Sequence, residues 1–404
     1  MTDVVQVSVA EIEKAAQLLD GVAVRTPMEE SRWLSALTGS QVLLKCENLQ
    51  RTGSFKVRGA YVRMSHLSAE ERARGVVAAS AGNHAQGVAL AAQMLGIEAT
   101  VFMPEGAPIP KEKATRGYGA HVVFHGRYLE DALAEARAFQ DRTGAILIHP
   151  FDNTDVVAGQ GTVGLEILEQ APELETVVVP CGGGGLLSGI AVAIKAKRPD
   201  VRVVGVQAEG AAAFPQSLQA GHPVPLRSMS TMADGIAVGL PGDVTFAAVR
   251  DLVDEVVTVS EASLSRAVLA TLERAKMVVE PAGAAAVAAI LDEPGRFTIP
   301  TVGVLSGGNI DPLLLGKVIQ HGMAAAGRYL NLTLRIPDRP GGLARLLSDV
   351  GEAGANVIEV AHARINPDLS LDEVEVHLQL ETRGETHAES VLSRIRERGY
   401  RIFE

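Results

Sequence analysis

The sequence of 404 residues has little cysteine, few aromatic residues and no excess of basic charge. Its two cysteines, Cys46 and Cys181, are far apart and lack metal-type spacing, which argues against a disulfide framework and a zinc site. The 37 lysines and arginines are outnumbered by 48 aspartates and glutamates, so the net charge is −11. This acidic balance argues against nucleic acid and anionic membranes as partners.

Long apolar segments are also missing. The longest run, AGAAAVAAIL at residues 282–291, falls far short of the ~20 residues that a membrane-spanning helix needs. The N-terminal residues do not combine a basic region with an apolar core, so a cytoplasmic location is expected. Hydrophobic residues make up 47% and charged residues 21%, which is ordinary for a globular protein with a sizeable core.

Residues 75–320 alternate short apolar runs with Ala-rich or amphipathic segments. The runs include GVVAAS, ATVFMP, AILIHP, TVVVPCGGGG and RVVGVQAEG. Strands that are apolar throughout and separated by helices are typical of parallel sheets buried on both faces. We therefore predict an α/β fold, doubly wound, for this part of the chain.

The pattern changes near Arg328. YLNLTLRIP alternates apolar and polar residues, as a half-exposed strand does, and GGLARLLSDVGEAG is typical of a helix that ends at glycine. Two more strands are expected in ANVIEVAHARI and LDEVEVHLQLET, then a helix in HAESVLSRIRERG and a strand in YRIFE. The order β-α-β-β-α-β predicts a ferredoxin-like domain over residues 329–404, with a boundary at about 325–329.

A lysine in GSFKVRGA, residues 53–60, stands at the expected start of a helix. Ser54 is a candidate cap, which would place Lys56 in the first turn. The positive end of the helix dipole and desolvation both disfavour an ammonium ion, and a neutral amine is the nucleophile that Schiff-base chemistry requires. The alternative is a helix lysine whose stem covers apolar surface while its head reaches water.

Four consecutive glycines, Gly182–Gly185, separate the run VVVPC from an apolar helix. Their N–H groups can turn toward one point in front of the helix N-terminus, which makes an anion cradle for a phosphate. The segment matches neither the dinucleotide-binding pattern nor the Walker A pattern, because no Lys-Ser/Thr pair follows the glycines. A tight connection between strand and helix is the alternative.

Two further turns follow expected strands. In ASAGNHAQG, N–H groups from about Gly82 onward are free to bind a carboxylate, and Asn83 offers a donor and an acceptor. In GVLSGGN, Ser306 follows a strand at the carboxyl edge of the sheet, where ligands gather. Ordinary turns, with Asn83 as a helix cap, are the alternatives. Together with the lysine and the glycines, these residues match what pyridoxal phosphate requires of a protein.

The motifs around these residues resemble those of the threonine dehydratases (threonine ammonia-lyases), which belong to the tryptophan-synthase-β-like, fold type II group of pyridoxal-phosphate enzymes. The resemblance runs in order through LLKCENLQRTGSFKVRGA, SAGNHAQGVA, GGGGLLSG, TMADGIAV, VVEPAGA and LSGGN. It implies two parallel-sheet α/β subdomains in a catalytic domain of residues 1–325. The smaller, mobile subdomain is expected at about 54–150.

The resemblance also implies roles for individual residues. Lys56 is expected to hold pyridoxal 5′-phosphate and to be the catalytic base. Asn83 is expected at the ring oxygen of the cofactor and Ser306 at its ring nitrogen. The cofactor phosphate is expected at the backbone of Gly182, Gly183, Gly184, Gly185 and Leu186, and the substrate carboxylate at the turn of Ser80, Ala81, Gly82, Asn83 and His84.

The activity implied is deaminating dehydration of L-threonine to 2-oxobutanoate and ammonia, and of L-serine to pyruvate. Serine racemases of this fold carry a serine where this chain has Ala81, and an alanine cannot deliver a proton, so little racemisation is predicted. Three alternatives stay open: a serine racemase/dehydratase, a non-catalytic amino-acid-responsive regulator and, on fold alone, a Rossmann oxidoreductase. The preferred substrate is also open, as is the choice between isoleucine biosynthesis and threonine breakdown.

The C-terminal stretch DRPGGLARLLSDVGEAGANV resembles ACT regulatory domains. This implies allosteric control by an amino-acid effector near the Gly341–Gly342 turn and Asn356, with a dimerisation module that lacks a ligand as the alternative. A homo-oligomer, tetramer or dimer, is expected. Some relatives bind a divalent cation through a glutamate and an acidic residue six positions on, but Glu209 is followed here by Pro215, so no metal is assigned.

Overall fold

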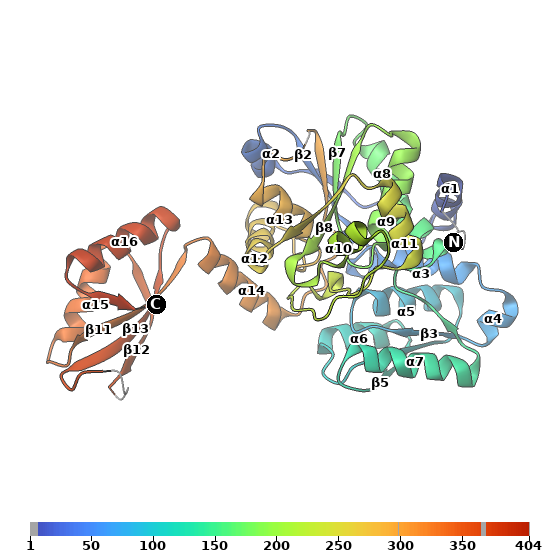
Figure 1. Ribbon diagram of the computed structural model, residues 1–404. Coiled ribbons are helices and arrows are strands. Elements are labelled where there is room, and N and C mark those ends of the chain that lie inside the picture. The colour runs from blue at the N-terminus through green and yellow to red at the C-terminus, as the bar shows by residue number, and fades with distance from the viewer. Residues whose placement is uncertain (1–6, 298, 365–368, 404) are drawn as a thin grey trace. The chain divides into compact units, whose positions relative to one another are not determined.

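The computed structural model describes residues 7–297, 299–364 and 369–403. The chain divides into two compact units, Met1–Leu315 and Gly316–Glu404. The division falls inside helix α14 (Pro312–Ala325), ahead of the boundary predicted at 325–329. The first strand after this helix begins at Tyr329 (Figure 1).

The first unit contains a six-stranded sheet with the order β1-β2-β10-β7-β8-β9. Neighbouring strands are parallel except β1 and β2. The six strands are β1 (Met28–Glu30), β2 (Val42–Lys45), β7 (Thr176–Pro180), β8 (Arg202–Ala208), β9 (Glu255–Val259) and β10 (Thr301–Val304).

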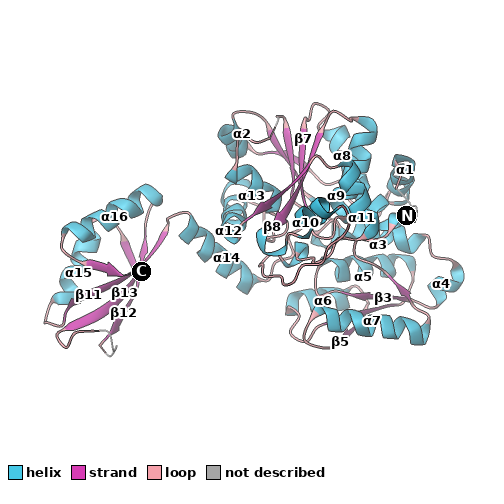
Figure 2. Cartoon of the chain, viewed as in Figure 1, coloured by secondary structure: helices cyan, strands magenta, loops and turns pink. Residues whose placement is uncertain are grey.

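Helices cover both faces of this sheet, as Figure 2 shows. Val177, Val179 and Val203 pack on one face against residues of α9 (Gly185–Lys197) and α11 (Asp243–Leu252). The opposite face lies against α13 (Ala285–Asp292), which contacts β7, β8, β9 and β10. Because both faces are buried, the central strands are apolar at nearly every position, as the sequence predicts.

A second sheet has four parallel strands in the order β5-β4-β3-β6. Its strands are β3 (Val76–Ala79), β4 (Ala99–Met103), β5 (His121–Phe124) and β6 (Ile146–Leu147), of which β6 covers only part of the predicted run AILIHP. Figure 1 shows β3 between α5 (Asn83–Leu95) and α7 (Leu129–Thr143). Val77 and Phe102 pack with Ala132 and Ala136 of α7, whereas alternate residues of the same strands pack with α5.

The remaining helices of the first unit complete these layers. They are α1 (Val9–Leu18), α2 (Arg32–Thr38), α3 (Lys56–Ser65), α4 (Ala69–Ala73), α6 (Ile109–Gly117), α8 (Thr154–Gln170), α10 (Ala213–Ala220) and α12 (Glu261–Ala270). Helix α3, which opens with Lys56, packs against α5 of the smaller sheet and against α8.

After α14, the described residues of the second unit form a four-stranded antiparallel sheet in the order β12-β13-β11-β14 and two further helices. Leu334, Leu346, Val376 and Val391 contribute to its core. Along the chain the elements are β11 (Tyr329–Pro337), α15 (Gly342–Glu352), β12 (Asn356–Ala363), β13 (Glu373–Glu381), α16 (Glu385–Glu397) and β14 (Arg401–Phe403). This order confirms the predicted ferredoxin-like arrangement, although the ends of two predicted strands, at 365 and 404, lie outside the described residues.

The predicted fold class is thus confirmed: parallel α/β sheets are followed by an antiparallel C-terminal sheet. Within the ranges that the structure describes, none of the helices combines the length and apolar character that a bilayer crossing demands.

Candidate active site

Lys56 is the first residue of α3, as the sequence predicts. Its Nζ atom donates to the carbonyl oxygen of Pro150 over 3.1 Å and lies 5.1 Å from the centre of the Phe55 ring. The predicted cap is wrong. Ser54 forms a β-bridge with Gly307 in an extended conformation, so Phe55 takes the cap position and the Ser54 hydroxyl has no partner among the described residues.

The surroundings of Lys56 favour its neutral amine. Burial lowers the pKa of Lys56 to about 8, and the nearby carboxyl of Glu280 acts in the opposite direction. Burial first, and then the charge of Lys56, lowers the pKa of His84 to about 3, so this imidazole is neutral at physiological pH. A group whose pKa lies close to the working pH can serve as a general base.

The turn of residues 80–84 joins β3 to α5. Gly82 stands at the cap position, and its N–H donates to Oγ of Ser80 over 3.1 Å, so this donor is engaged within the turn. Asn83 and His84 are buried and begin the helix, where N–H groups lack partners inside the helix. The turn can therefore accept a carboxylate at the start of α5, one residue later than Gly82.

The amide of Asn83 is held from both sides. Its Nδ2 donates to Oε1 of Glu280 over 2.5 Å, and its Oδ1 accepts from Nδ2 of Asn309 over 2.8 Å. Both partners lie in quoted motifs, VVEPAGA and LSGGN, but no individual role was predicted for either. The available signal for Glu280 was an ionisable residue inside the apolar stretch MVVEPAGAAAVAA.

A second pair that the sequence did not reveal is Lys111 and Asp234. Nζ of Lys111, on α6, lies 2.7 Å from Oδ2 of Asp234, which begins the 3₁₀ turn Asp234–Ile236, and the lysine side chain is only 8% exposed. A Cβ built on Gly82 would lie 3.9 Å from the same Nζ. A buried cation therefore lies beside the 80–84 turn.

The four glycines join β7 to α9 and leave no room for side chains. A Cβ on Gly183 would lie 2.5 Å from the Phe151 ring, and one on Gly184 would lie 2.8 Å from the Phe214 ring. Gly184 also has a φ of +95°, in the region that favours glycine.

The donors of this loop are available to a ligand. The N–H groups of Gly182, Gly183 and Gly184 donate to no protein acceptor in the described part of the chain. Gly185 and Leu186 belong to the first turn of α9, whose N–H groups have no partner within the helix. Five N–H groups in front of a helix N-terminus fit a phosphate.

Ser306 follows β10 and is 4% exposed. Its carbonyl oxygen accepts from the N–H of Phe55, the residue before Lys56, over 3.3 Å. A Cβ built on the adjacent Gly307 would lie 3.1 Å from Nδ2 of Asn83. The segment that carries Ser306 therefore contacts both the Lys56 segment and the Asn83 amide.

One connection joins the lysine to the glycine loop. Lys56 donates to Pro150, and the next residue, Phe151, packs directly on Gly183. The structure thus brings the predicted amine, glycine cradle, amide and hydroxyl into one neighbourhood. This combination fits pyridoxal phosphate, which needs an amine, a phosphate site and partners for its ring heteroatoms.

Other predicted features lie elsewhere. Glu209 belongs to the 3₁₀ turn Glu209–Ala211 after β8, and no group of three or more His, Cys, Asp or Glu residues suited to a metal occurs among the described residues.

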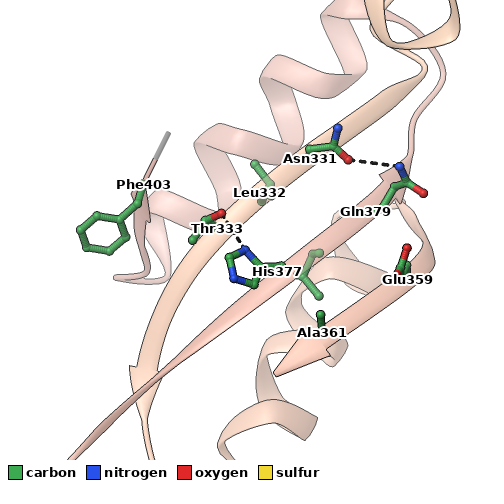
Figure 3. A pocket seen from close by; sticks show the side chains of 9 residues that line it. Asn331, Leu332, Thr333, Glu359, Ala361, His377, Gln379 and Phe403 are labelled. Atoms are coloured by element: carbon green, nitrogen blue, oxygen red, sulfur yellow. Dashed lines mark hydrogen bonds between the residues drawn. The ribbon is translucent and has the colours of Figure 1, made fainter. Parts of the chain in front are cut away.

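In the second unit a hollow of about 370 Å³ lies on the exposed face of the sheet. Figure 3 shows its polar lining on neighbouring strands, with Thr333 against His377 and Asn331 against Gln379. The Gly341–Gly342 turn and Asn356, the predicted effector residues, do not line this hollow.

Known proteins resemble the chain over most of its length. It is 46% identical over 396 residues to an L-threonine ammonia-lyase of Thermotoga maritima, covering 98% of this chain and 99% of the relative. An L-threonine ammonia-lyase of Geobacter sulfurreducens is 48% identical over 94% of each chain.

Solved structures give the same result for the fold. The structure of maize serine racemase matches with a TM-score of 0.74 and 37% identity, covering 79% of this chain and 99% of that one. A threonine deaminase from T.th. matches with a TM-score of 0.72 and 44% identity, covering 75% of this chain and 99% of that one. The profile of the family described as "Pyridoxal-phosphate dependent enzyme" matches residues 19–308. The residues described above form a site that fits pyridoxal phosphate, and the family match covers most of the chain. The chain therefore belongs to the pyridoxal-phosphate dependent enzymes of fold type II.

Proposed function

We propose that this protein is a threonine ammonia-lyase, which converts L-threonine to 2-oxobutanoate and ammonia and L-serine to pyruvate. The observation that carries the proposal is the buried Lys56 amine, which is joined through Pro150 and Phe151 to a glycine loop whose N–H groups have no protein acceptors among the described residues. The similarity to an L-threonine ammonia-lyase, which covers 98% of the whole chain, supports it. When bound, the cofactor supplies an electron sink for the negative charge that forms on the substrate's Cα.

Lys56 is the proposed base that removes the Cα proton. Its lowered pKa leaves a substantial share of neutral amine near pH 8. The first-turn N–H groups of α5 hold the substrate carboxylate, and the ammonium of Lys111 supports them from the side of Gly82. These contacts fix the substrate so that its Cα proton faces the lysine.

The remaining residues hold the cofactor. The N–H groups of Gly182–Gly185 and Leu186 take the phosphate, Asn83 contacts the ring oxygen, and Ser306 faces the ring nitrogen. A neutral hydroxyl at this nitrogen imposes no charge on the ring, which favours prompt loss of the β-hydroxyl over a long-lived negative charge on Cα.

A serine racemase/dehydratase is the second candidate, because maize serine racemase is among the similar structures. A stopped assay with L-threonine and with L-serine, which measures oxo acid and D-serine in one tube, decides between them. Oxo acid without D-serine is the expected result. Abundant D-serine would favour the racemase, and no product from either substrate would contradict both.

The smaller sheet, within residues 54–150, is proposed to close over the substrate. Residues 329–404, within the second unit, are proposed to be an ACT domain that binds an amino-acid effector at the Gly341–Gly342 turn. The enzyme is proposed to be a cytoplasmic homo-oligomer. Threonine saturation curves with and without isoleucine or valine test the effector. A shift in half-saturation is expected, and identical curves would contradict control by these two amino acids.

A further inference from the structure

Glu280 is a buried carboxyl group for which the mechanism above has no role. The side chain is 2% exposed, and its Oε1 accepts from Nδ2 of Asn83 over 2.5 Å. Its Oε2 is buried and has no hydrogen-bond partner among the described residues. A buried acceptor without a partner is costly, so its presence beside the candidate site requires an explanation.

The carboxyl group lies between two glycine backbones. A Cβ on Gly307 would lie 2.4 Å from Oε1, and one on Gly235 would lie 3.5 Å from the same atom. The N–H of Glu280 itself donates to the carbonyl oxygen of Gly307 over 3.1 Å. The group is therefore fixed between the end of β10 and the 3₁₀ turn that contains Gly235.

Three charged groups act on this carboxyl from three different elements. Asp234 is on the 3₁₀ turn, Lys111 is on α6 and Lys56 is on α3. Burial is the largest influence and raises the pKa of Glu280 to about 7; Asp234 adds to the rise, while Lys111, the Asn83 hydrogen bond and Lys56 oppose it. Glu280 can thus exchange a proton near neutral pH.

The hydrogen bonds also determine which way the Asn83 amide points. Nδ2 of Asn309 donates both to the carbonyl oxygen of Thr52 and to Oδ1 of Asn83, so the amide oxygen faces Asn309. One N–H of Asn83 is taken by Glu280, and an amide carries two. The second N–H donates to no acceptor among the described residues and would be available to the cofactor ring.

We propose that Glu280 is a titratable positioning residue of the cofactor site, which orients the Asn83 amide toward the ring and changes the charge beside it by gaining or losing a proton. The proposal rests on the role given to Asn83 in the proposed function. It adds a group that connects the protonation of the protein to the electronic state of the bound cofactor.

The test is a pH titration of the absorbance spectrum of the cofactor-loaded enzyme without substrate. The wild-type spectrum is expected to change with a midpoint near pH 7. Glu280→Gln keeps an acceptor for Asn83 but cannot ionise, so this change should disappear while the cofactor stays bound. Glu280→Ala removes the hydrogen bond as well and should weaken cofactor binding about tenfold.

Two further variants make the result specific. Asp234→Asn removes the negative charge that raises the pKa of Glu280, so the midpoint should move to lower pH. Glu273→Gln, an exposed position seven residues earlier in the same segment, should keep the wild-type midpoint. If Glu280→Gln does not fold, the direction of the Asp234→Asn shift alone decides.

A wild-type spectrum that does not change near pH 7 would overturn the proposal. So would a Glu280→Gln enzyme with the wild-type midpoint, or an Asp234→Asn enzyme whose midpoint is unmoved. The experiment uses no substrate, so it is independent of the assay for threonine. Suppose that the spectral change is lost in Glu280→Gln and that the wild-type enzyme forms no oxo acid from threonine. This pair of results would support the role of Glu280 and contradict the proposed function.

Discussion

The Nζ atom of Lys56 donates to the carbonyl oxygen of Pro150 over 3.1 Å, and this bond connects the first residue of α3 with the segment that follows β6 of the smaller sheet. The same segment continues into Phe151, which packs against Gly183. A short stretch of chain therefore determines how the proposed base lies relative to the proposed phosphate cradle.

The lowered pKa of Lys56 predicts a pH dependence of the reaction. Because its pKa is lowered to about 8, the neutral amine predominates above that pH and is scarce below it. We expect kcat for L-threonine to rise about tenfold for each pH unit below this value and to level off above it. Measuring kcat between about pH 6 and 10 checks this; a flat profile, or a rise that continues to the ordinary pKa of lysine, would contradict it.

The glycine cradle predicts that a methyl group at position 183 impairs cofactor binding. In Gly183→Ala the new Cβ would lie 2.5 Å from the Phe151 ring, so the ring or the loop must move. We expect the dissociation constant of pyridoxal phosphate to rise at least about tenfold, equal to the loss of one charge-assisted hydrogen bond. The matched control is Gly117→Ala, where nothing lies within 4 Å of the new atom, and unchanged affinity in both variants would count against the cradle.

A buried ion network supports the helix that begins with Lys56. Arg58 donates to both carboxylate oxygens of Glu47 and to Oε1 of Glu166, with only 1% of its side chain exposed. Arg58→Met preserves much of the side-chain volume but leaves Glu47 buried without its charge partner. We expect a loss of about 3–5 kcal/mol in the free energy of unfolding, measured by urea denaturation.

The control for this loss is on the same helix. Arg63 pairs with Asp155, but both side chains are 24% exposed. Arg63→Met should cost about 0–1 kcal/mol, because water screens the pair. Equal losses in the two variants would show that burial of the network is not the cause.

Ala81 provides a test of the balance between elimination and racemisation. It is half-buried in the 80–84 turn, between β3 and α5. Ala81→Ser adds a hydroxyl that can exchange a proton, so D-serine formed from L-serine should increase while the folded protein is retained. Chiral analysis of the product measures this. No increase in D-serine would mean that this position does not control the outcome.

The parallel sheets and the C-terminal ferredoxin-like order were predictable because burial on two faces and burial on one face produce different sequence patterns. Lys56, Asn83, Ser306 and the glycines could be singled out because each lies in a short, recognisable motif, and their roles at the cofactor stay predictions. Glu280 and Lys111 could not be singled out, since their partners lie 197 and 123 residues away in the sequence and only the fold brings them together. The Ser54 cap was wrong because a β-bridge to Gly307 competes with capping.

The most direct test of the account is reductive trapping of the cofactor in the intact enzyme. Borohydride treatment followed by digestion and mass spectrometry should place the reduced pyridoxal phosphate on the peptide that contains Lys56, and Lys56→Ala should be colourless and unlabelled. Label on another lysine, or a coloured and active Lys56→Ala enzyme, would contradict the central role given to this residue.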